Sequence, residues 1–309
     1  MRAAVLTSYD RSPSASEFPA PEPDNGNVVV DVAAAGVNHV DLMKASGTFY
    51  TGAPPLPSVV GSDGVGRLAD GRRVYFDTTV APYGAIAEQA LVDPADLLDV
   101  PDGVDDAVAA AMGNCGLAAW LALTRRAQLA PGETVLVLGA SGAVGGVAVQ
   151  AAKVLGAGRV IAAARAGERL SRLVERGADA IVELDAADDP HAAFAAAPPD
   201  VTIDLLWGAP AVAAMRAAAH GARHIQIGHI AAPTAEIAAA AIRAPALDVR
   251  GFAVFHHPLE ERRAAYRELG EQVLAGRIAM DVERVPLDGV AAAWERQRAG
   301  AGVKLIVTP

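Results

Sequence analysis

The stretch Thr134-Val-Leu-Val-Leu-Gly139-Ala140-Ser141-Gly142-Ala143-Val144-Gly145-Gly146 joins a short β-rich run directly to a glycine-spaced turn that opens a helix. Gly142 and Gly145 lack side chains where backbone must approach a pyrophosphate and where the helix must pack on the strand. The first N–H groups of such a helix have no partner within it and suit phosphate oxygens. The pattern predicts a dinucleotide cradle, with a glycine-rich turn without a ligand as the alternative. The cradle residues are Ala140, Ser141, Gly142, Ala143, Val144 and Gly145.

After Pro131 the chain alternates between strand-like and helix-like runs. We expect a helix at 144–155 and strands at 134–138, 159–164, 180–184, 201–206 and 223–227, with a sixth strand at 247–254. This alternation is typical of a doubly wound parallel α/β sheet covered by helices. A helix at 259–275 follows, and we expect the short strands beyond it to return to the first domain.

The first part of the chain has a different pattern. Short β-rich runs begin at Val28, Arg73 and Ile86 and are separated by glycines and prolines, which indicates an irregular β-barrel. The sequence therefore predicts two domains, one formed by 1–112 with 255–309, and a nucleotide-binding domain at 113–254.

Composition and charge narrow the class of protein. At 309 residues with 52% hydrophobic residues, the chain can fill two domain cores. A formal net charge of -10 and a pI near 5.2 argue against a nucleic-acid partner or an anionic membrane surface. No run approaches the length of a membrane span and no signal peptide follows Met1, so we expect a cytoplasmic protein. The single cysteine, Cys115, excludes an intrachain disulfide and a multi-cysteine zinc site, and we expect it to be a buried packing residue.

Six segments in a fixed order carry a family resemblance. They are Gly36-Val-Asn38-His-Val-Asp41, Gly61-Ser-Asp-Gly64-Val-Gly66, Gly71-Arg-Arg-Val74, Gly84-Ala-Ile-Ala87-Glu88, Leu129-Ala-Pro-Gly132-Glu-Thr-Val-Leu-Val and Gln150-Ala-Ala-Lys153-Val-Leu-Gly156-Ala. Over essentially its whole length the chain resembles the medium-chain dehydrogenase/reductase superfamily, in the zinc-independent quinone oxidoreductase (zeta-crystallin-like) branch. The resemblance implies a GroES-like β-barrel catalytic domain, a Rossmann domain with a six-stranded parallel sheet, and a cleft between them. Two departures are the short segment from Gly66 to Gly71 and Leu184, where many relatives carry a cofactor-contacting tyrosine.

The residues at the positions of zinc ligands argue against a metal. A zinc alcohol dehydrogenase needs a soft or imidazole ligand in the first of these segments and a histidine after Gly61. This chain has Asn38 and Ser62 there, and the nearby His39 and Asp41 make a poor tetrahedral set. We therefore predict no metal site. Without a metal to stabilise an alkoxide, reduction of an enone or quinone is favoured, because hydrogen-bond donors and positioning suffice for it.

The end of the second strand of the nucleotide-binding domain distinguishes NADH from NADPH. An NADH site places Asp or Glu there for the ribose 2′-hydroxyl, whereas an NADPH site offers a cation to the 2′-phosphate. Arg165 stands at this register and can bind a phosphate bidentately, and Arg169 or Lys153 adds charge. A solvated arginine beside Glu168 is the alternative. The sequence favours NADPH.

By the resemblance, Asn38 lies at the floor of the cleft and Tyr50 at its wall, and both are candidate catalytic residues. The Asn38 amide would donate to a substrate oxygen or fix a neighbouring loop; the alternative is a turn residue bonded to its own backbone. Tyr50 would donate a hydrogen bond or a proton, or else only pack, because a phenol with a pKa of about 10 needs tuning to act as an acid. We expect Asp41 to cap a helical turn or form a salt bridge.

Further candidates follow strand ends. Gly228 ends a predicted strand and His229 follows it, in the region where open α/β sheets bind ligands, so we place both at the cofactor. We expect His224 to be structural and Trp207 to pack beside a strand end that borders the nicotinamide pocket. The His256–His257 pair is expected at the cleft or at a subunit contact.

Together these features predict an NADPH-dependent, zinc-independent oxidoreductase that transfers hydride to a quinone or another α,β-unsaturated carbonyl, with the proton supplied by solvent. Two alternatives stay open, a trans-acting enoyl-thioester reductase and a nucleotide-binding protein without turnover, as in the crystallin-like members of the family. We expect no nucleic-acid or membrane partner. The resemblance and the apolar strand edge at 247–254 suggest a homodimer.

Overall fold

The structure is a computed structural model that describes residues 1–49, 52–186 and 189–309 and divides the chain between two units. Unit 1 consists of Met1–Gly116, Leu259–Ala275 and Met280–Pro309, and unit 2 of Leu117–Pro258 and Gly276–Ala279. The main boundaries, after Gly116 and Pro258, lie four residues beyond those expected from the sequence.

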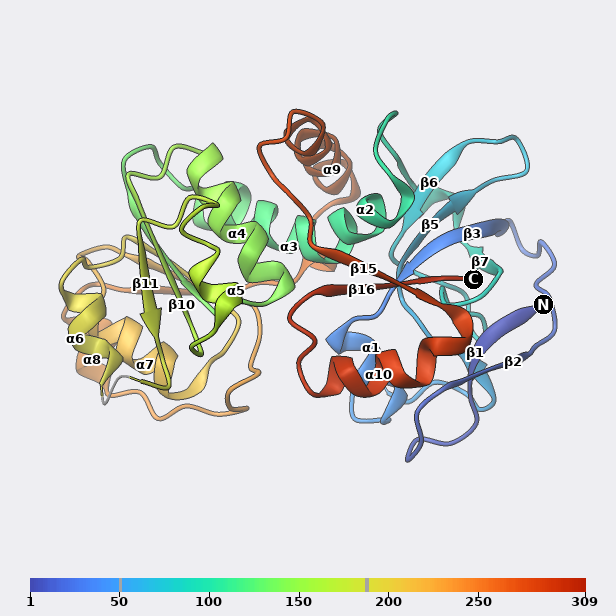
Figure 1. The fold of residues 1–309 in the computed structure, drawn as a ribbon, viewed down its shortest axis with the longest axis horizontal. Coiled ribbons are helices and arrows are strands. Elements are labelled where there is room, and N and C mark those ends of the chain that lie inside the picture. Colours follow the sequence, from blue (N-terminus) through green and yellow to red (C-terminus); the bar gives the residue numbers. More distant parts are fainter. Residues whose placement is uncertain (50–51, 187–188) are drawn as a thin grey trace. The chain divides into compact units, whose positions relative to one another are not determined.

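Unit 2 is built on a six-stranded parallel sheet with the order β11-β10-β9-β12-β13-β14 (Figure 1). The strands are β9 (Thr134–Leu138), β10 (Arg159–Ala164), β11 (Ala180–Glu183), β12 (Val201–Asp204), β13 (Arg223–Gln226) and β14 (Asp248–Gly251). β9 and β12 are buried at nearly every position, as expected for strands covered on both faces. The strand order reverses between β9 and β12, so the doubly wound sheet predicted from the sequence is confirmed.

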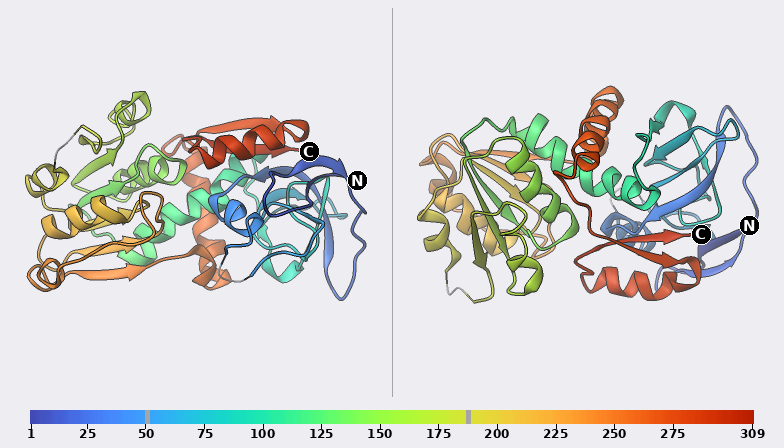
Figure 2. Two further views of the ribbon diagram at one scale, coloured as in Figure 1. Left: turned by 90° about the horizontal axis from the view of Figure 1, so that it is seen from below. Right: turned by 45° about the horizontal axis from the view of Figure 1, so that its top comes forward.

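Helices cover both faces of this sheet (Figures 1 and 2). On one face lie α4 (Ala143–Val154) and α5 (Glu168–Ser171), and on the other α6 (Pro190–Ala195), α7 (Gly208–Ala217) and α8 (Ala239–Arg243). Alanines of α7 pack with Leu136, Ile161 and Phe194 in a buried cluster. Their small side chains let the helix lie close to the strands. A 3₁₀ turn, Val254–His256, follows β14.

The sequence did not predict a long helical segment at residues 106–127. It comprises α2 (Asp106–Ala111), a π-helical turn Met112–Gly116, α3 (Leu117–Leu121) and a second π-helical turn Ala122–Ala127. The expectation that no run approaches a membrane span was wrong, because this 22-residue segment is long and apolar enough to cross one. However, 83% of its apolar window is buried inside the protein, as in the core helix of a folded domain.

Unit 1 is rich in β-structure, as expected for the first domain. Its larger sheet has the order β15-β16-β3-β5-β6-β8, with β7 also pairing with β3, and a smaller sheet has the order β2-β1-β4. The strands are β1 (Arg2–Leu6), β2 (Ser14–Glu17), β3 (Val28–Gly36), β4 (Ser58–Val59), β5 (Gly64–Arg67), β6 (Arg73–Phe76), β7 (Gln89–Val92), β8 (Leu98–Asp99), β15 (Val282–Pro286) and β16 (Lys304–Thr308). Because β16 pairs antiparallel with β3, the end of the chain returns to the N-terminal region.

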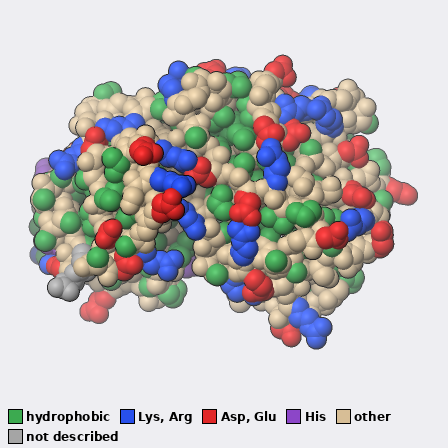
Figure 3. Space-filling model, in the orientation of Figure 1, with side chains coloured by type: hydrophobic (Ala, Val, Ile, Leu, Met, Phe, Trp, Pro, Cys, Tyr) green, Lys and Arg blue, Asp and Glu red, His purple; other side chains and the backbone are tan. Residues whose placement is uncertain are grey.

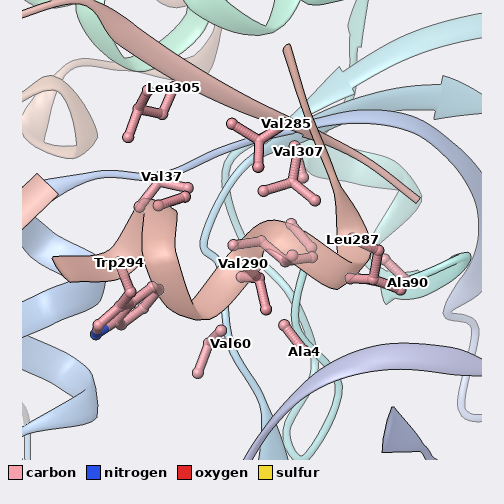
Figure 4. Packing of buried hydrophobic residues seen from close by; sticks show 14 of the residues in the cluster. Ala4, Val37, Val60, Ala90, Val285, Leu287, Val290, Trp294, Leu305 and Val307 are labelled. Carbon is pink, nitrogen blue, oxygen red and sulfur yellow. The ribbon is translucent and has the colours of Figure 1, made fainter. Parts of the chain in front are cut away.

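The core of unit 1 lies between its strands and one helix (Figure 4). Val290 and Trp294 of α10 (Val290–Arg298) lie in one buried cluster with Val37, Val60 and Leu305. The unit also contains α1 (His39–Ala45), α9 (Leu259–Leu274) and the 3₁₀ turns Pro94–Asp96 and Leu287–Gly289. This packing holds β3 and β16 beside α1, and the polar cluster described below lies where these elements meet.

Candidate functional site

The glycine turn joins β9 to α4 at the carboxyl edge of the sheet. Gly139 has φ +83°, a conformation that favours glycine. A Cβ on Gly145 would lie 2.3 Å from the carbonyl oxygen of Gly139. A Cβ on Gly142 would have that same oxygen as its sole neighbour within 4 Å among the described atoms, at 3.4 Å. The fold therefore requires glycine at 145, whereas the space beside Gly142 is left open for a ligand.

The start of α4 suits a negatively charged group. Gly142 is the N-cap and Ala143 the first helical residue, so the N–H groups of the first turn have no partner within the helix. Ser141, Gly142, Ala143 and Val144 are partly exposed, whereas Ala140 is buried. Backbone donors, the positive end of the helix and the space beside Gly142 together fit the pyrophosphate of a dinucleotide.

A second turn, Leu205–Gly208, connects β12 to α7 and lies against the glycine turn. A Cβ on Gly139 would lie 3.2 Å from both Leu205 Cβ and Leu206 Cδ2. Asp204 is fully buried, and its Oδ1 accepts hydrogen bonds of 2.9 Å from the N–H groups of Leu206 and Trp207. Asp204 thereby fixes this turn at the point where the strand order reverses.

A third turn follows β13 and meets the second. The N–H of Gly228 donates to the carbonyl of Asp204 at 3.2 Å, and a Cβ on Gly228 would lie 2.9 Å from the carbonyl oxygen of Leu205. The N–H of Ala231 donates to Leu206 at 2.9 Å. His229 is exposed next to this contact. The glycine turn and Gly228 therefore contact the Leu205–Gly208 turn from opposite sides.

The candidate 2′-phosphate ligands follow β10. Arg165 directly follows β10 and Arg169 lies in α5, and both are exposed. The backbone there is held by Asp185 Oδ1, which accepts from the N–H of Ala166 at 2.7 Å. Lys153 does not belong to this group, because it lies at the C-terminal end of α4 and its ammonium pairs with Asp179 at 2.7 Å.

A cavity of about 620 Å³ lies beside these turns in unit 2. It is lined by Leu184, Asp189, Pro190, Gly208, Ala209, Pro210, Val212, Ala213, Arg216, Ala232, Thr234, Ala235 and Glu236. Leu184, which stands where relatives carry a tyrosine, is part of this lining. The sequence did not point to Asp189, Arg216 or Glu236, because they belong to no motif and come from the separate segments that follow β11, β12 and β13.

In unit 1, Asn38 is 5% exposed, and both the nitrogen and the oxygen of its side-chain amide are hydrogen-bonded. Its Nδ2 donates to Asp41 Oδ2 at 3.0 Å and to Asp63 Oδ1 at 2.7 Å. Its Oδ1 accepts from the ammonium of Lys304, which also donates to the carbonyl of Val37 at 3.2 Å. Both amide hydrogens of Asn38 are therefore engaged by protein carboxylates. The second role suggested by the sequence, fixing a neighbouring loop, fits this geometry.

Asp63 is fully buried between Asn38 and the hydroxyl of Tyr75, which donates to Asp63 Oδ2 at 3.2 Å. Burial raises the pKa of the Asp63 carboxyl, the charge of Lys304 opposes this, and the charge of Asp41 adds to it. Burial and the carboxylate of Asp63 hold the pKa of Tyr75 well above its usual range. Burial also raises the pKa of the Cys115 thiol, as suits a packing residue.

The positions that carry zinc ligands in zinc alcohol dehydrogenases are occupied here by a hydrogen-bonded chain. Ser62 Oγ donates to Asp41 Oδ1 at 2.6 Å and accepts from the ammonium of Lys44 at 2.9 Å. Within residues 1–49, 52–186 and 189–309, no group of three or more His, Cys, Asp or Glu side chains is placed to hold a metal ion. Tyr50, the other candidate catalytic residue, lies outside the described residues.

Comparison with known proteins matches each of the two units to a family model. A model of the alcohol dehydrogenase GroES-like domain matches residues 24–102, and a zinc-binding dehydrogenase model matches residues 143–273. The quinone oxidoreductase of Thermus thermophilus, whose structures include a complex with NADPH, is 30% identical, with all of both chains covered and a TM-score of 0.83. The chain belongs to the medium-chain dehydrogenase/reductase superfamily. Within it, the chain falls in the quinone oxidoreductase-like branch.

Other relatives match over part of their length. Quinone oxidoreductase-like protein 2 of Mus musculus is 34% identical over 188 residues, covering 57% of this chain and 52% of the relative. Polyketide synthase GfsB of Streptomyces halstedii is 33% identical over 213 residues, covering 66% of this chain and 4% of the relative. The chain thus spans about half of the first relative and a small part of the second.

Proposed function

We propose that this medium-chain dehydrogenase/reductase is an NADPH-dependent, zinc-independent reductase of quinones or other α,β-unsaturated carbonyls. The observation that carries the proposal is the cradle at the start of α4, where the fold needs glycine at 145 and leaves the space beside Gly142 open. The NADPH complex of the Thermus thermophilus relative supports the choice of cofactor. Bound NADPH supplies the hydride.

The residues of the chain have separate tasks in this proposal. The backbone N–H groups of Ser141, Ala143 and Val144 hold the pyrophosphate, and Arg165, assisted by Arg169, holds the 2′-phosphate. The turns at Leu205–Gly208 and Gly228–His229 border the nicotinamide end. Backbone donors and fixed turns orient the cofactor in this proposal.

On the acceptor side, Asn38 holds its loop through Asp41, Asp63 and Lys304. Tyr50 remains the proposed hydrogen-bond donor to the acceptor. Zinc independence is supported by the chemistry at the ligand positions, where an amide and a hydroxyl are bonded to carboxylates and ammonium groups. A conjugated acceptor spreads the developing charge onto its oxygen, so donors and positioning suffice, and solvent supplies the proton.

The test is NADPH consumption by the chelator-treated protein with quinones, cyclic enones and enoyl thioesters as acceptors, and NADH as the paired control. We expect turnover with quinones or enones that is unchanged by chelation and faster with NADPH than with NADH. Activity that chelation abolishes and zinc restores would refute the zinc-free mechanism.

A second candidate is a trans-acting enoyl-thioester reductase, and the likeness to part of a polyketide synthase is the observation that favours it. Such a substrate needs a basic entrance for its phosphate groups. On the face shown in Figure 3, basic and acidic side chains are interspersed. Exclusive turnover of enoyl thioesters in the same acceptor panel would establish this candidate. Tight NADPH binding without turnover of any acceptor would instead indicate a nucleotide-binding protein without catalysis.

The net charge of -10 supports the proposal that the protein acts in the cytoplasm on a small molecule, without nucleic acid or membrane. We also propose a homodimer formed through the β14 edge, because β14 is the last strand of the sheet and its outer edge pairs with no other described strand.

A further inference from the structure

A carboxylate and an imidazole are buried together beneath the proposed nicotinamide end of the site. Asp204 ends β12 and is 0% exposed, and His224 on the neighbouring strand β13 is 1% exposed. His224 Nε2 lies 2.9 Å from Asp204 Oδ2. Because an ionised carboxylate accepts hydrogen bonds but does not donate them, Nε2 carries the hydrogen of this bond. From the sequence His224 was expected to be structural, and the cofactor chemistry described above does not use it.

The carboxylate of Asp204 links this imidazole to the turn that follows. Its Oδ2 faces His224, while its Oδ1 accepts from the N–H groups of Leu206 and Trp207 at 2.9 Å each. Without the imidazole, one oxygen of a fully buried carboxylate would lose its donor. A buried charge with an unpaired oxygen is costly, so the orientation of the carboxylate depends on His224.

The turn held in this way is strained. Trp207 has φ 58° and ψ −166°, a backbone conformation found almost exclusively in glycine. Its ring lies 6.3 Å from that of His224, edge to face at 71°. A residue stays in such a conformation when its surroundings over-determine it, and strain of this kind gathers at functional sites. Here the two hydrogen bonds that Asp204 accepts and the packing of the indole on His224 supply the constraint.

His224 Nδ1 adds an independent observation, because this buried atom has no hydrogen-bond partner within the described residues. If His224 served only to fill space, a leucine would do so without burying an unsatisfied nitrogen. The polar contribution of the ring is therefore its bond to Asp204.

We propose that the Asp204–His224 pair positions the Leu205–Gly208 turn for the nicotinamide cofactor, a role that rests on the proposed function. The turn touches the glycine turn through Leu205 and Leu206, which lie within 3.2 Å of where a Cβ on Gly139 would be. Tilting the carboxylate of Asp204 releases the N–H groups of Leu206 and Trp207 and moves this turn. His224 acts through Asp204, so it is a positioning residue and not a catalytic one.

The test compares His224→Gln, whose amide nitrogen can still donate to Asp204, with His224→Leu, which keeps bulk and removes the donor. His220→Gln is the control, since His220 is exposed in the same unit. We expect His224→Leu to weaken NADPH binding about tenfold or more while kcat at saturating NADPH changes by less than about threefold. We expect His224→Gln to bind within about threefold of the unchanged protein, and both variants to keep their far-ultraviolet dichroism.

Tryptophan emission supplies a second measurement that needs no cofactor. With Trp207→Phe used to isolate the Trp207 signal, we expect His224→Leu to shift this emission and His224→Gln to leave it nearly unchanged. If the unchanged protein binds no NADPH, the proposed function fails while this emission still reports on the turn. Equal losses in both variants, or binding and emission unaffected in a folded His224→Leu protein, would overturn the positioning role.

Discussion

Buried polar side chains in unit 1 show how single residues set the chemistry of the proposed active site. Asn38 joins two carboxylates and an ammonium group through one amide, so its orientation is determined from three directions. The sequence marked Asn38 as a candidate but did not reveal Lys304 as its partner, because 266 positions separate the two in the chain. Contacts of this kind depend on the register in which β16 pairs with β3, and no local pattern encodes that register.

At Asp63 the geometry leads to a dependence of stability on pH. Burial raises the pKa of this carboxyl above its ordinary value of 3.8 in the folded protein. Between 3.8 and the raised value, the folded chain holds more protons at this site than the unfolded chain, so the contribution of Asp63 to stability falls as pH rises. Asp63→Asn keeps the shape and removes the titration. We therefore expect the stability of the variant relative to the unchanged protein to increase with pH across this window.

Denaturant unfolding of both proteins at a series of pH values measures this difference. A difference that is constant with pH, or that shrinks as pH rises, would contradict the raised pKa.

Arg165 carries the choice between NADPH and NADH. Arg165→Ala removes the guanidinium that we assign to the 2′-phosphate, and we expect the KM for NADPH to rise about tenfold or more while that for NADH changes little. Arg172→Ala is a matched control, because Arg172 is an exposed arginine on the same segment that pairs with Glu168 at 2.5 Å. Steady-state kinetics with both nucleotides decides the question. Equal effects of Arg165→Ala on the two KM values would remove Arg165 from the cofactor site.

At the scale of elements, the strands of unit 2 were predicted with ends that differ from the observed ones by a few residues at most. β9, β10 and β12 are largely apolar runs, each next to a glycine or an aspartate. The helical segment at 106–127 was missed. Gly113 and Gly116 interrupt its alanine-rich run and lower its helix propensity, yet tertiary contacts require the first of them. A Cβ on Gly113 would lie 1.9 Å from the ring of Tyr75. Local propensity therefore pointed away from a helix that packing enforces.

The two glycines of the cradle make a matched pair of predictions. Gly145→Ala places a methyl group 2.3 Å from the carbonyl oxygen of Gly139, so we expect a loss of stability of about 1–3 kcal/mol. Gly142→Ala meets its nearest described atom at 3.4 Å, so stability should change by less than about 0.5 kcal/mol while NADPH binding weakens about tenfold. Thermal unfolding and nucleotide titration measure the two effects. Unchanged NADPH binding in Gly142→Ala would mean that the pyrophosphate lies elsewhere.

At the scale of the whole molecule, the outer edge of β14 is the surface through which we propose that two chains pair. The N–H of Asp248 donates to the carbonyl of Ala222 and that of Phe252 to the carbonyl of Gln226, both at 2.9 Å and both toward β13. Because successive residues of a strand alternate in direction, the N–H of Val249 points away from the sheet. Arg126 donates to the carbonyl of Gly251 at 3.0 Å, which covers one end of this edge. Val249 is 39% exposed and lies in the part of this edge that Arg126 does not cover.

If two chains pair along this edge, Val249→Pro removes an outward hydrogen-bond donor and leaves the ladder to β13 intact. We expect light scattering to give the mass of two chains for the unchanged protein and of one chain for Val249→Pro. A single-chain mass for the unchanged protein at micromolar concentration would refute the homodimer.

The scarcity of lysine has a consequence for chemical labelling. The chain has 26 basic residues, but its lysines are Lys44, Lys153 and Lys304, and each ammonium donates to an oxygen of the protein. Acylating reagents must break these contacts before they react, and Lys304, at 4% exposed, is the most protected. The rate at which Lys304 acquires an acyl group therefore reports how often unit 1 opens, and mass spectrometry can follow that opening at one named position.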